Sequence, residues 1–188
     1  MKKILISLIL CLPITSFSAS PLWIGVGTLT HNFLTAQVDE KSGTKKFELA
    51  PTVIIGTTLP FFYSRLFFSP GIGYAKFSTK DKTSKSEIIL QYHLSQEIFS
   101  SFLMQFGFSN YITKISGDGG TVLLNNGSSY TSFYAPSASH TTYTASLDLG
   151  GEFIFTKNIS ARAQISILRF LSSDRRRVSH LLTANYFL

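Results

Sequence analysis

Apolar and polar residues alternate along most of the chain beyond its first twenty residues. The segment TTYTASLDLGGEFIF (141–155) shows the pattern clearly, with apolar or small residues at odd positions and polar residues or glycine at most even ones. A period of two predicts a β-strand with one apolar and one polar face. The apolar face forms the core of a soluble sandwich, but it faces lipid in a barrel that crosses a membrane. The function therefore depends on which face meets water.

Eight segments of this kind, separated by turn-like polar clusters, follow one another as the strands of a meander do. Their approximate bounds are 22–38, 45–58, 63–77, 86–98, 102–115, 141–155, 159–171 and 177–188. Each is long enough for the roughly 9–11 residues that a tilted strand needs to cross a bilayer, and several exceed the roughly 5–6 usual in soluble sheets. The sequence therefore predicts an all-β fold, an eight-stranded antiparallel up-and-down transmembrane β-barrel.

The connections between these segments alternate in length. TLPFF, FSSF and TKN, after the second, fourth and sixth segments, are tight turns. The other connections are longer and polar, and the longest covers residues 116–140. Short turns on one side and long loops on the other are typical of outer-membrane barrels, whose short turns are periplasmic. With an even number of strands, we expect both termini in the periplasm of a Gram-negative cell.

The polar face of the predicted strands has the composition of a barrel interior. It contains glycine, glutamine and single charges of both signs, whereas a solvated sheet face usually carries more Lys and Glu. We therefore expect the polar face to point inward. The residues expected to form a polar network in the lumen are Arg65, Gln91, Glu97, Gln105, Asp148, Glu152, Arg162 and Gln164.

Two opposite-charge pairs follow from the hairpin geometry. Centring the TKN turn on Lys157 places Glu152 opposite Arg162, and the same reasoning places Arg65 close to Glu97. If a pair is enclosed, removing one partner leaves an uncompensated buried charge and costs roughly 3–5 kcal/mol. An exposed cross-strand pair would contribute only a few tenths of a kcal/mol.

The start of the chain, MKKILISLILCLPITSFSAS, has a basic beginning, an apolar run and small residues near position 18. This pattern predicts a secretory signal peptide over 1–18, followed by a barrel domain over 19–188. The single cysteine, Cys11, lies inside the signal segment, which argues against a disulfide framework and against thiolate metal ligands. His31, His140 and His180 are too scattered in sequence to indicate a metal site, and we expect neither a metal nor a cofactor.

The last segment, VSHLLTANYFL, alternates up to its final residue. Here the chain resembles the small eight-stranded bacterial outer-membrane β-barrel proteins of the OmpX and OmpW kind. The resemblance covers strand number, loop asymmetry and the closing strand. It implies an outer-membrane location and recognition of the last strand by the barrel-insertion machinery. Family members end in an aromatic residue, whereas this chain ends in Leu188 after Tyr186 and Phe187.

A weaker resemblance links SPGIGYAKFS (69–78) and SARAQISI (160–167) to the outer-membrane lipid A deacylases. Those enzymes use a His-x-Ser pair on the penultimate strand, with a carboxylate that orients the histidine. Here that strand has no histidine. A His-x-Ser does occur at His93 and Ser95, with Glu97 beyond it, and these three are weak catalytic candidates because they lie on the fourth strand. We expect no enzymatic activity.

The outer loops carry a basic rim and an aromatic cluster. The rim residues are Lys41, Lys45, Lys46, Lys80, Lys82, Lys85, Arg175, Arg176 and Arg177. On a cell surface such a rim would face lipopolysaccharide phosphates rather than nucleic acid, and a merely solvated rim is the alternative. Tyr130, Phe133 and Tyr134 stand among small polar residues, a composition that suits surface recognition.

The sequence therefore predicts an outer-membrane protein with a structural, adhesion or surface-recognition role, in contact with membrane lipid and lipopolysaccharide, and we expect a monomer. Three alternatives remain open at this point. A small pore would use the polar lumen, a lipid A-modifying hydrolase would use the weak catalytic candidates, and a soluble secreted barrel would bind a ligand inside.

Overall fold

The computed structural model describes residues 22–31, 49–61, 63–77, 83–117, 119–125, 130–134, 137–172 and 176–188. The predicted signal segment at 1–18 lies outside these residues. Within the described ranges, no helix is long and apolar enough to cross a membrane.

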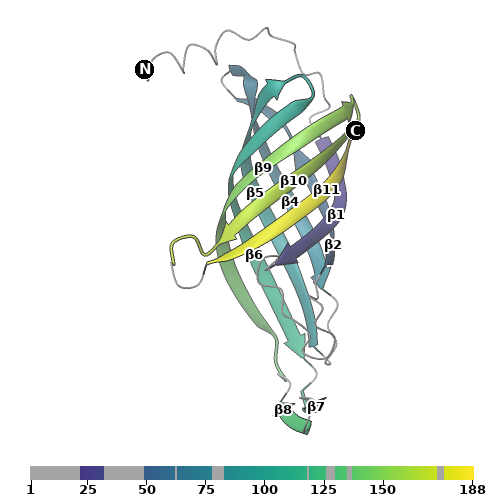
Figure 1. The fold of residues 1–188 in the computed structure, drawn as a ribbon, viewed down its shortest axis with the longest axis vertical. Helices are drawn as coiled ribbons and strands as arrows, with labels where there is room; N and C mark the ends of the chain where they lie inside the picture. The colour runs from purple at the N-terminus through teal and green to yellow at the C-terminus, as the bar shows by residue number, and fades with distance from the viewer. Residues whose placement is uncertain are drawn as a thin grey trace.

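The described residues form a closed antiparallel barrel with a small separate hairpin (Figure 1). Its strands are β1 (Leu22–His31), β2 (Ala50–Thr57), β3 (Leu59–Phe61), β4 (Tyr63–Phe77), β5 (Thr83–Phe99), β6 (Phe102–Gly117), β9 (His140–Thr156), β10 (Ile159–Leu168) and β11 (Arg177–Phe187). The hairpin comprises β7 (Thr121–Asn125) and β8 (Tyr130–Tyr134). Around the barrel the order is β2, β1, β11, β10, β9, β6, β5 and β4, and pairing of β2 with β4 closes the sheet. The predicted eight-stranded architecture is confirmed, with β3 as a short extension that also pairs with β4.

The structure differs from the predicted strand bounds most clearly at two places. The seventh segment was expected over 159–171, but β10 ends at Leu168 because Arg169 has a left-handed φ of 54° and the chain turns there. TLPFF was expected to be only a turn, yet Leu59 and Pro60 pair with Phe68 and Phe67. Of the first segment's predicted 22–38, residues 32–38 lie outside the described residues.

The long connection expected over 116–140 contains the β7–β8 hairpin. Val122, Leu123 and Leu124 favour a strand, as does YTSFY, and the sequence between them includes Asn-Gly, a strong hairpin-turn signal. The prediction of a loop throughout 116–140 is therefore wrong for 121–125 and 130–134, which are strands.

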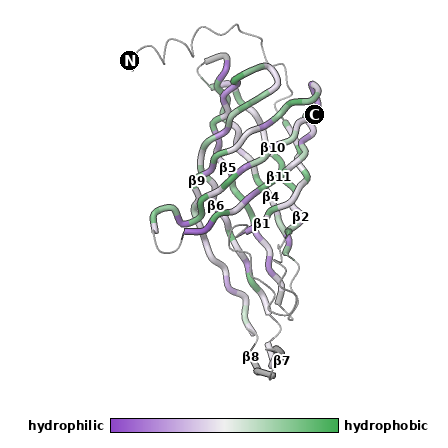
Figure 2. The backbone as a smooth tube through the Cα atoms, in the orientation of Figure 1, coloured by the Kyte–Doolittle hydropathy of each residue, from purple (hydrophilic) through white to green (hydrophobic). Residues whose placement is uncertain are grey.

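The side chains alternate between a buried inner face and an exposed outer face. On β10, Ser160, Arg162, Gln164 and Ser166 are buried, whereas Ile159, Ile165 and Ile167 are exposed. The polar face therefore points inward, as predicted. Figure 2 shows the same alternation of hydrophilic and hydrophobic residues along the strands. A closed barrel with an apolar outer wall satisfies its backbone hydrogen bonds within the sheet, which is the requirement for crossing a bilayer.

Aromatic side chains gather on the outer wall near the short turns. Phe99 and Phe102 flank the β5–β6 turn with ring centroids 6.0 Å apart, and Phe153 and Phe155 precede the β9–β10 turn with centroids 5.2 Å apart. Tyr186, at the end of β11, is also exposed. Such a girdle is typical of the boundary between the apolar band and the headgroups.

The two ends of the barrel differ. The backbone N–H of Leu188 donates to the carbonyl of Leu22, so the first and last residues of the barrel meet at the short-turn end. The adjacent strands β4, β5, β6 and β9 are longer, with 15, 17, 16 and 17 residues, than β1, β2, β10 and β11, with 10, 8, 10 and 11. The extra residues of β4 lie at the short-turn end, where they pair with β3, and at the other end β4 stops level with the start of β2. The neighbouring strands β5, β6 and β9 therefore project beyond the rest at the long-loop end, and the β7–β8 hairpin lies at the far tip (Figure 1).

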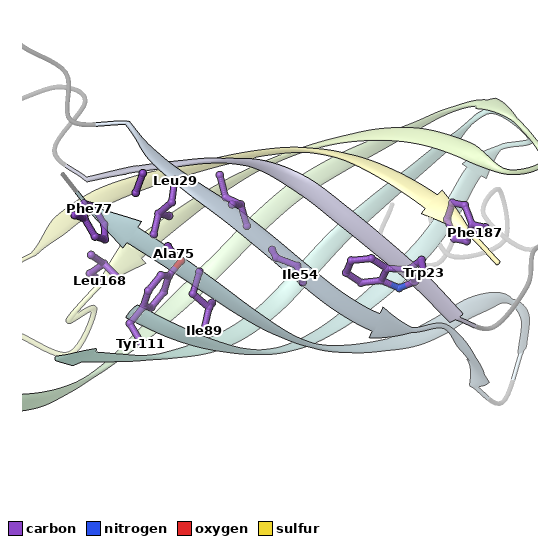
Figure 3. Close-up of a cluster of buried hydrophobic side chains, with 11 residues drawn as sticks. Trp23, Leu29, Ile54, Ala75, Phe77, Ile89, Tyr111, Leu168 and Phe187 are labelled. Carbon is purple, nitrogen blue, oxygen red and sulfur yellow. The ribbon is translucent and has the colours of Figure 1, made fainter. Parts of the chain in front are cut away.

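The lumen is not purely polar. Trp23 and Phe187 are buried near the short-turn end, and a second apolar group is buried toward the long-loop end (Figure 3). The second group includes Leu29, Ala75, Phe77, Ile89, Tyr111 and Leu168. The sequence had led us to expect a lumen filled by polar side chains, but β1, β2 and β4 supply mainly apolar residues or glycine to the interior. Most of the buried polar residues therefore lie between two apolar layers.

Phe106 provides a test of the facing, because it lies on the outer wall with 40% of its surface exposed. Phe106→Arg should impair insertion by roughly 2–4 kcal/mol if the side chain lies near the bilayer midplane. The measurement is urea-dependent folding into lipid vesicles, followed by the heat-modifiable mobility of the folded barrel, with Phe106→Leu as the control. If Phe106→Arg inserts and resists heat like the parent, the assignment of the faces is wrong.

Gly107 is the neighbouring inward position and should respond differently. A Cβ at Gly107 would lie 2.2 Å from the carbonyl oxygen of Tyr92 and 2.9 Å from the His93 ring. Gly107→Ala should therefore lower the stability of the folded barrel through overpacking, by about 1–3 kcal/mol. Insertion of the variant into vesicles at low urea should still occur, because the outer wall is unchanged.

Candidate functional site

The polar interior is organised around the carboxylate of Glu152. The β9–β10 register places Glu152 opposite Arg162, as the turn-centred prediction required. The Nη2 and Nε atoms of Arg162 donate to Glu152 Oε2 at 2.8 and 3.2 Å. Gln105 Nε2 also donates to Oε2 at 2.9 Å, while Asn185 Nδ2, at 2.9 Å, and the Ser160 hydroxyl donate to Oε1. Groups from three strands besides β9 thus satisfy this buried charge.

Arg162 also contacts the apolar layer at the short-turn end. Its guanidinium carbon lies 4.2 Å from the centre of the Trp23 ring, which comes from β1. Arg162 is only 3% exposed and Trp23 is fully buried, so this cation–π contact is shielded from water. The ion pair therefore has one side against other polar groups and one side against an aromatic ring.

A second polar group centres on Asp148. His93 Nε2 lies 2.9 Å from Asp148 Oδ2, the Ser146 hydroxyl donates to Oδ1 at 2.7 Å, and the Ser109 hydroxyl donates to Oδ2. His93 and Asp148 lie on β5 and β9, and Gly107 on β6 pairs with both. The His93 ring crosses the space where a side chain at position 107 would stand. Glycine at this position is therefore what allows the histidine to reach the carboxylate.

A third group links the polar interior to the long-loop end. Gln91 Nε2 donates to Gln164 Oε1 at 3.1 Å, Gln164 Nε2 donates to the Ser166 hydroxyl at 3.1 Å, and Tyr111 also donates to that hydroxyl at 3.1 Å. All four side chains are buried. Uncharged amides and hydroxyls here make a bridge across the lumen from β5 to β10.

A charged cluster closes the mouth at the long-loop end. His31 Nε2 lies 2.7 Å from Glu87 Oε2, and Lys85 Nζ lies 3.5 Å from Glu87 Oε1. Thr113 donates to the same Glu87 oxygen at 3.0 Å. Lys85 also lies 3.8 Å from the centre of the Phe77 ring. Because β1 and β5 are not neighbours in the sheet, the His31–Glu87 contact spans the lumen.

The predicted lumen residues are distributed over these groups. Gln91, Gln105, Asp148, Glu152, Arg162 and Gln164 make the contacts described above, and Glu97 is buried on β5. Arg65 is half-buried, and the β4–β5 register, which pairs Leu66 with Gln96, places Arg65 opposite Glu97 when continued by one residue. His31, Glu87 and Tyr111 were missed, although Glu87 shares the inward face of Gln91 and Tyr111 shares that of Gln105.

The weak catalytic candidates do not form a nucleophile–base pair. His93, Ser95 and Glu97 share the inward face of β5, but His93 Nε2 is engaged by Asp148 and the Ser95 hydroxyl lies 3.0 Å from that of Ser69. His93 is 1% exposed and Ser95 is fully buried, so a substrate has no access to either. Among the described residues, no group of three or more His, Cys, Asp or Glu side chains is arranged to hold a metal ion.

The predicted outer rim is described only in part. Lys41, Lys45, Lys46, Lys80, Lys82 and Arg175 lie outside the described residues. Lys85 turns toward Glu87 at the mouth of the lumen, whereas Arg176 and Arg177 are exposed. Strand β8 contains the backbone of Tyr130, Phe133 and Tyr134, and the structure does not describe their side chains.

Comparison with solved structures identifies the fold. Ail, the attachment invasion locus protein of Yersinia pestis, has a TM-score of 0.51 at 11% identity, over 89% of this chain and 98% of that chain. The chain has the fold of the small eight-stranded outer-membrane β-barrels. The resemblance predicted from the sequence is thus confirmed at the level of architecture.

Two further structures have lower TM-scores than Ail. Neisserial surface protein A has a TM-score of 0.48 at 13% identity, over 90% of this chain and 97% of that chain. Outer membrane phospholipase A from Escherichia coli has a TM-score of 0.32 at 8% identity, over 91% and 98%. No protein-family model matches the sequence, and a search of curated proteins finds no match.

The Glu152–Arg162 pair permits a direct test of the enclosed lumen. Glu152→Gln or Arg162→Met alone should destabilise the barrel by roughly 3–5 kcal/mol, because each leaves the other charge buried without its partner. The double variant should be less destabilised than the sum of the single variants. The measurement is a double-mutant cycle of urea-induced unfolding from vesicles or detergent, and a coupling energy below about 0.5 kcal/mol would contradict the enclosed pair.

Proposed function

We propose that the chain is an integral protein of the Gram-negative outer membrane that holds a surface for adhesion or recognition outside the cell. In this arrangement the short turns and both termini are periplasmic, and the long-loop end is extracellular. The observation that carries the proposal is the projection of β5, β6 and β9 beyond the shorter strands, with the β7–β8 hairpin at its tip. A strand extended past the apolar band can position loop residues at a fixed distance from the membrane, and sites for recognition are commonly loops held by such a scaffold.

The filling of the lumen supports a scaffold rather than a pore. Three polar groups bridge the interior between β5, β6, β9, β10 and β11, and apolar side chains lie on both sides of them. Eight-stranded barrels have an interior just wide enough for side chains to fill. The buried ion pair of Glu152 and Arg162 would have to separate for an ion to pass, which leaves two uncompensated charges.

The proposal extends to the surroundings of the protein. The exposed Arg176 and Arg177 at the long-loop end suit the phosphates of lipopolysaccharide, and the apolar wall suits the acyl chains. Ail, which shares the fold, is described as an attachment invasion locus protein, so the fold is compatible with attachment. We infer a monomer inserted by the barrel-insertion machinery, without enzymatic activity or a nucleic-acid partner.

The first test concerns the orientation and the hairpin. Protease added to intact cells should cut within residues 118–139 before any other part of the chain, because this connection is extracellular in the proposed topology. Replacing residues 119–136 by a short glycine linker should leave the heat-modifiable barrel intact, since β7 and β8 pair only with each other among the described strands. Cleavage only after cell lysis would contradict the topology.

The hairpin deletion also tests the role in adhesion. Cells that express the parent protein should adhere to cultured epithelial cells more than cells without it, and cells with the deletion should lose this gain. The matched control replaces the turn residues Ser100 and Ser101 at the opposite end by glycine. Equal adhesion by the parent and the deletion variant would contradict a recognition role for the hairpin.

The second test separates the scaffold from a pore. In planar bilayers the purified parent protein should give no stable conductance steps, because hydrogen-bonded polar side chains and buried apolar side chains lie across the lumen. Glu152→Gln combined with Arg162→Ala opens space beside Trp23 but leaves the His93–Asp148 and Gln91–Gln164 contacts in the lumen, so this variant should also give no stable steps. Steady conductance from the parent would favour the pore instead.

A further inference from the structure

The outer wall of the barrel contains a long hollow between β6 and β1. Two adjoining hollows, of about 480 and 730 Å³, share Thr28, Phe102, Gly151, Ala163 and Leu182 in their lining. Most of the lining side chains belong to the outward face of their strands. The two hollows therefore form one continuous groove on the face that meets lipid.

The groove exists because outward positions on three neighbouring strands are small. The register places Gly151 beside Ala163, and Ala161 beside Ala184. Phe102 and Met104 on β6 form one bank of this floor, and Val26 and Leu182 form the other. A Cβ at Gly151 would lie 2.9 Å from two atoms of the Phe102 ring, so this ring packs directly over the glycine.

One end of the groove is polar. Thr28, Thr30 and His180 line it near the long-loop end of β1 and β11, where Thr30 and His180 pair. Thr30 is 6% exposed, and its hydroxyl has no hydrogen-bond partner. A buried hydroxyl without a partner lowers stability, and such a group next to a groove is suited to a ligand's acceptor. The groove therefore runs from a polar end near the mouth to an apolar end at the aromatic girdle.

We propose that this groove holds one acyl chain of a membrane lipid, with the carbonyl of the chain's ester or amide link accepting a hydrogen bond from Thr30. The chain lies over Ala163 and Ala161, beside the Phe102 ring that covers Gly151, and the headgroup extends past His180 toward the long-loop side. The proposal rests on membrane insertion, which is part of the proposed function, but not on adhesion.

The shape of the groove favours a lipid over a second copy of the barrel. The wall elsewhere carries large outward side chains such as Val53, Ile55, Ile72 and Tyr74 at alternate positions, which makes it convex and studded. A convex surface of this kind cannot fill a narrow groove that has Gly and Ala at its base and Phe, Met and Leu along its sides. A single flexible acyl chain can fill it, and its polar link and apolar tail match the two ends.

The test uses the exported chain folded into vesicles and then extracted in a mild detergent for native mass spectrometry. One set of vesicles contains phosphatidylethanolamine and phosphatidylglycerol, and a second set also contains lipopolysaccharide, so that the source of the chain can be distinguished. Heat-modifiable mobility is checked first for every variant, which separates a failure to insert from a failure to bind lipid. The parent protein should retain one lipid per barrel from at least one set.

Three variants define the site. Ala163→Leu fills the floor and should reduce lipid retention on the order of tenfold through steric overpacking. Ala145→Leu makes the same change at an exposed outward position of β9 that does not line the groove, and should retain lipid like the parent. Thr30→Val keeps the shape but removes the hydroxyl, and should weaken retention about fivefold.

Three outcomes would overturn the proposal. Equal retention by Ala163→Leu and Ala145→Leu, or no retention by the parent, would show that the groove holds no specific chain. A parent that is dimeric in sedimentation and becomes monomeric on Ala163→Leu would assign the groove to a second copy. The hairpin deletion should lose adhesion but retain lipid, and Ala163→Leu should lose lipid but retain adhesion. The failure of one proposal can therefore be distinguished from the failure of the other.

Discussion

The structure depends on the pairing of β2 with β4, which turns an open sheet into a closed barrel. Without this seam, two strands would present unpaired N–H and C=O groups to hydrocarbon, where each costs several kcal/mol. The seam contains Gly56 paired with Gly71, and Ile54 paired with Gly73. A Cβ at Gly56 would lie 2.3 Å from the Trp23 indole. Glycine in the seam thus makes room for the largest side chain of the lumen.

Closure also creates the two environments to which the side chains respond. The interior strands divide into a mainly polar half, β5, β6, β9, β10 and β11, and a mainly apolar half, β1, β2 and β4. Arg162 connects the halves, because it pairs with Glu152 and also lies over Trp23. Since the interior is enclosed, the charge of Glu152 persists there only with the five hydrogen bonds that surround it. Polar residues can be abundant inside this membrane fold because they satisfy one another.

The sequence was sufficient for the local features of the fold. Alternation assigned the faces of β6, β9 and β10, and turn counting placed Glu152 opposite Arg162, because period and hairpin register are properties of neighbouring residues. Contacts across the lumen were not predictable in the same way. His93 meets Asp148 only because Gly107 lies between them, and His31 meets Glu87 only once the barrel has closed. The apolar ends of the lumen were missed because the nearest inward neighbours of Trp23 and Phe187 on their own strands, Gly25 and Asn185, are small or polar. The outer groove likewise depends on which small residues of separate strands become neighbours.

The Glu152–Arg162 pair also fixes the register of the β9–β10 hairpin. If β9 and β10 slipped by one residue relative to each other, the side chains of one strand would exchange faces and a charge would enter hydrocarbon. A slip by two residues would keep both faces but would leave two enclosed charges without partners. Apolar alternation alone rejects the first error and tolerates the second. The buried ion pair therefore disfavours the register shift by two residues that the apolar pattern tolerates. It does so from inside the barrel, where lipid composition has no influence.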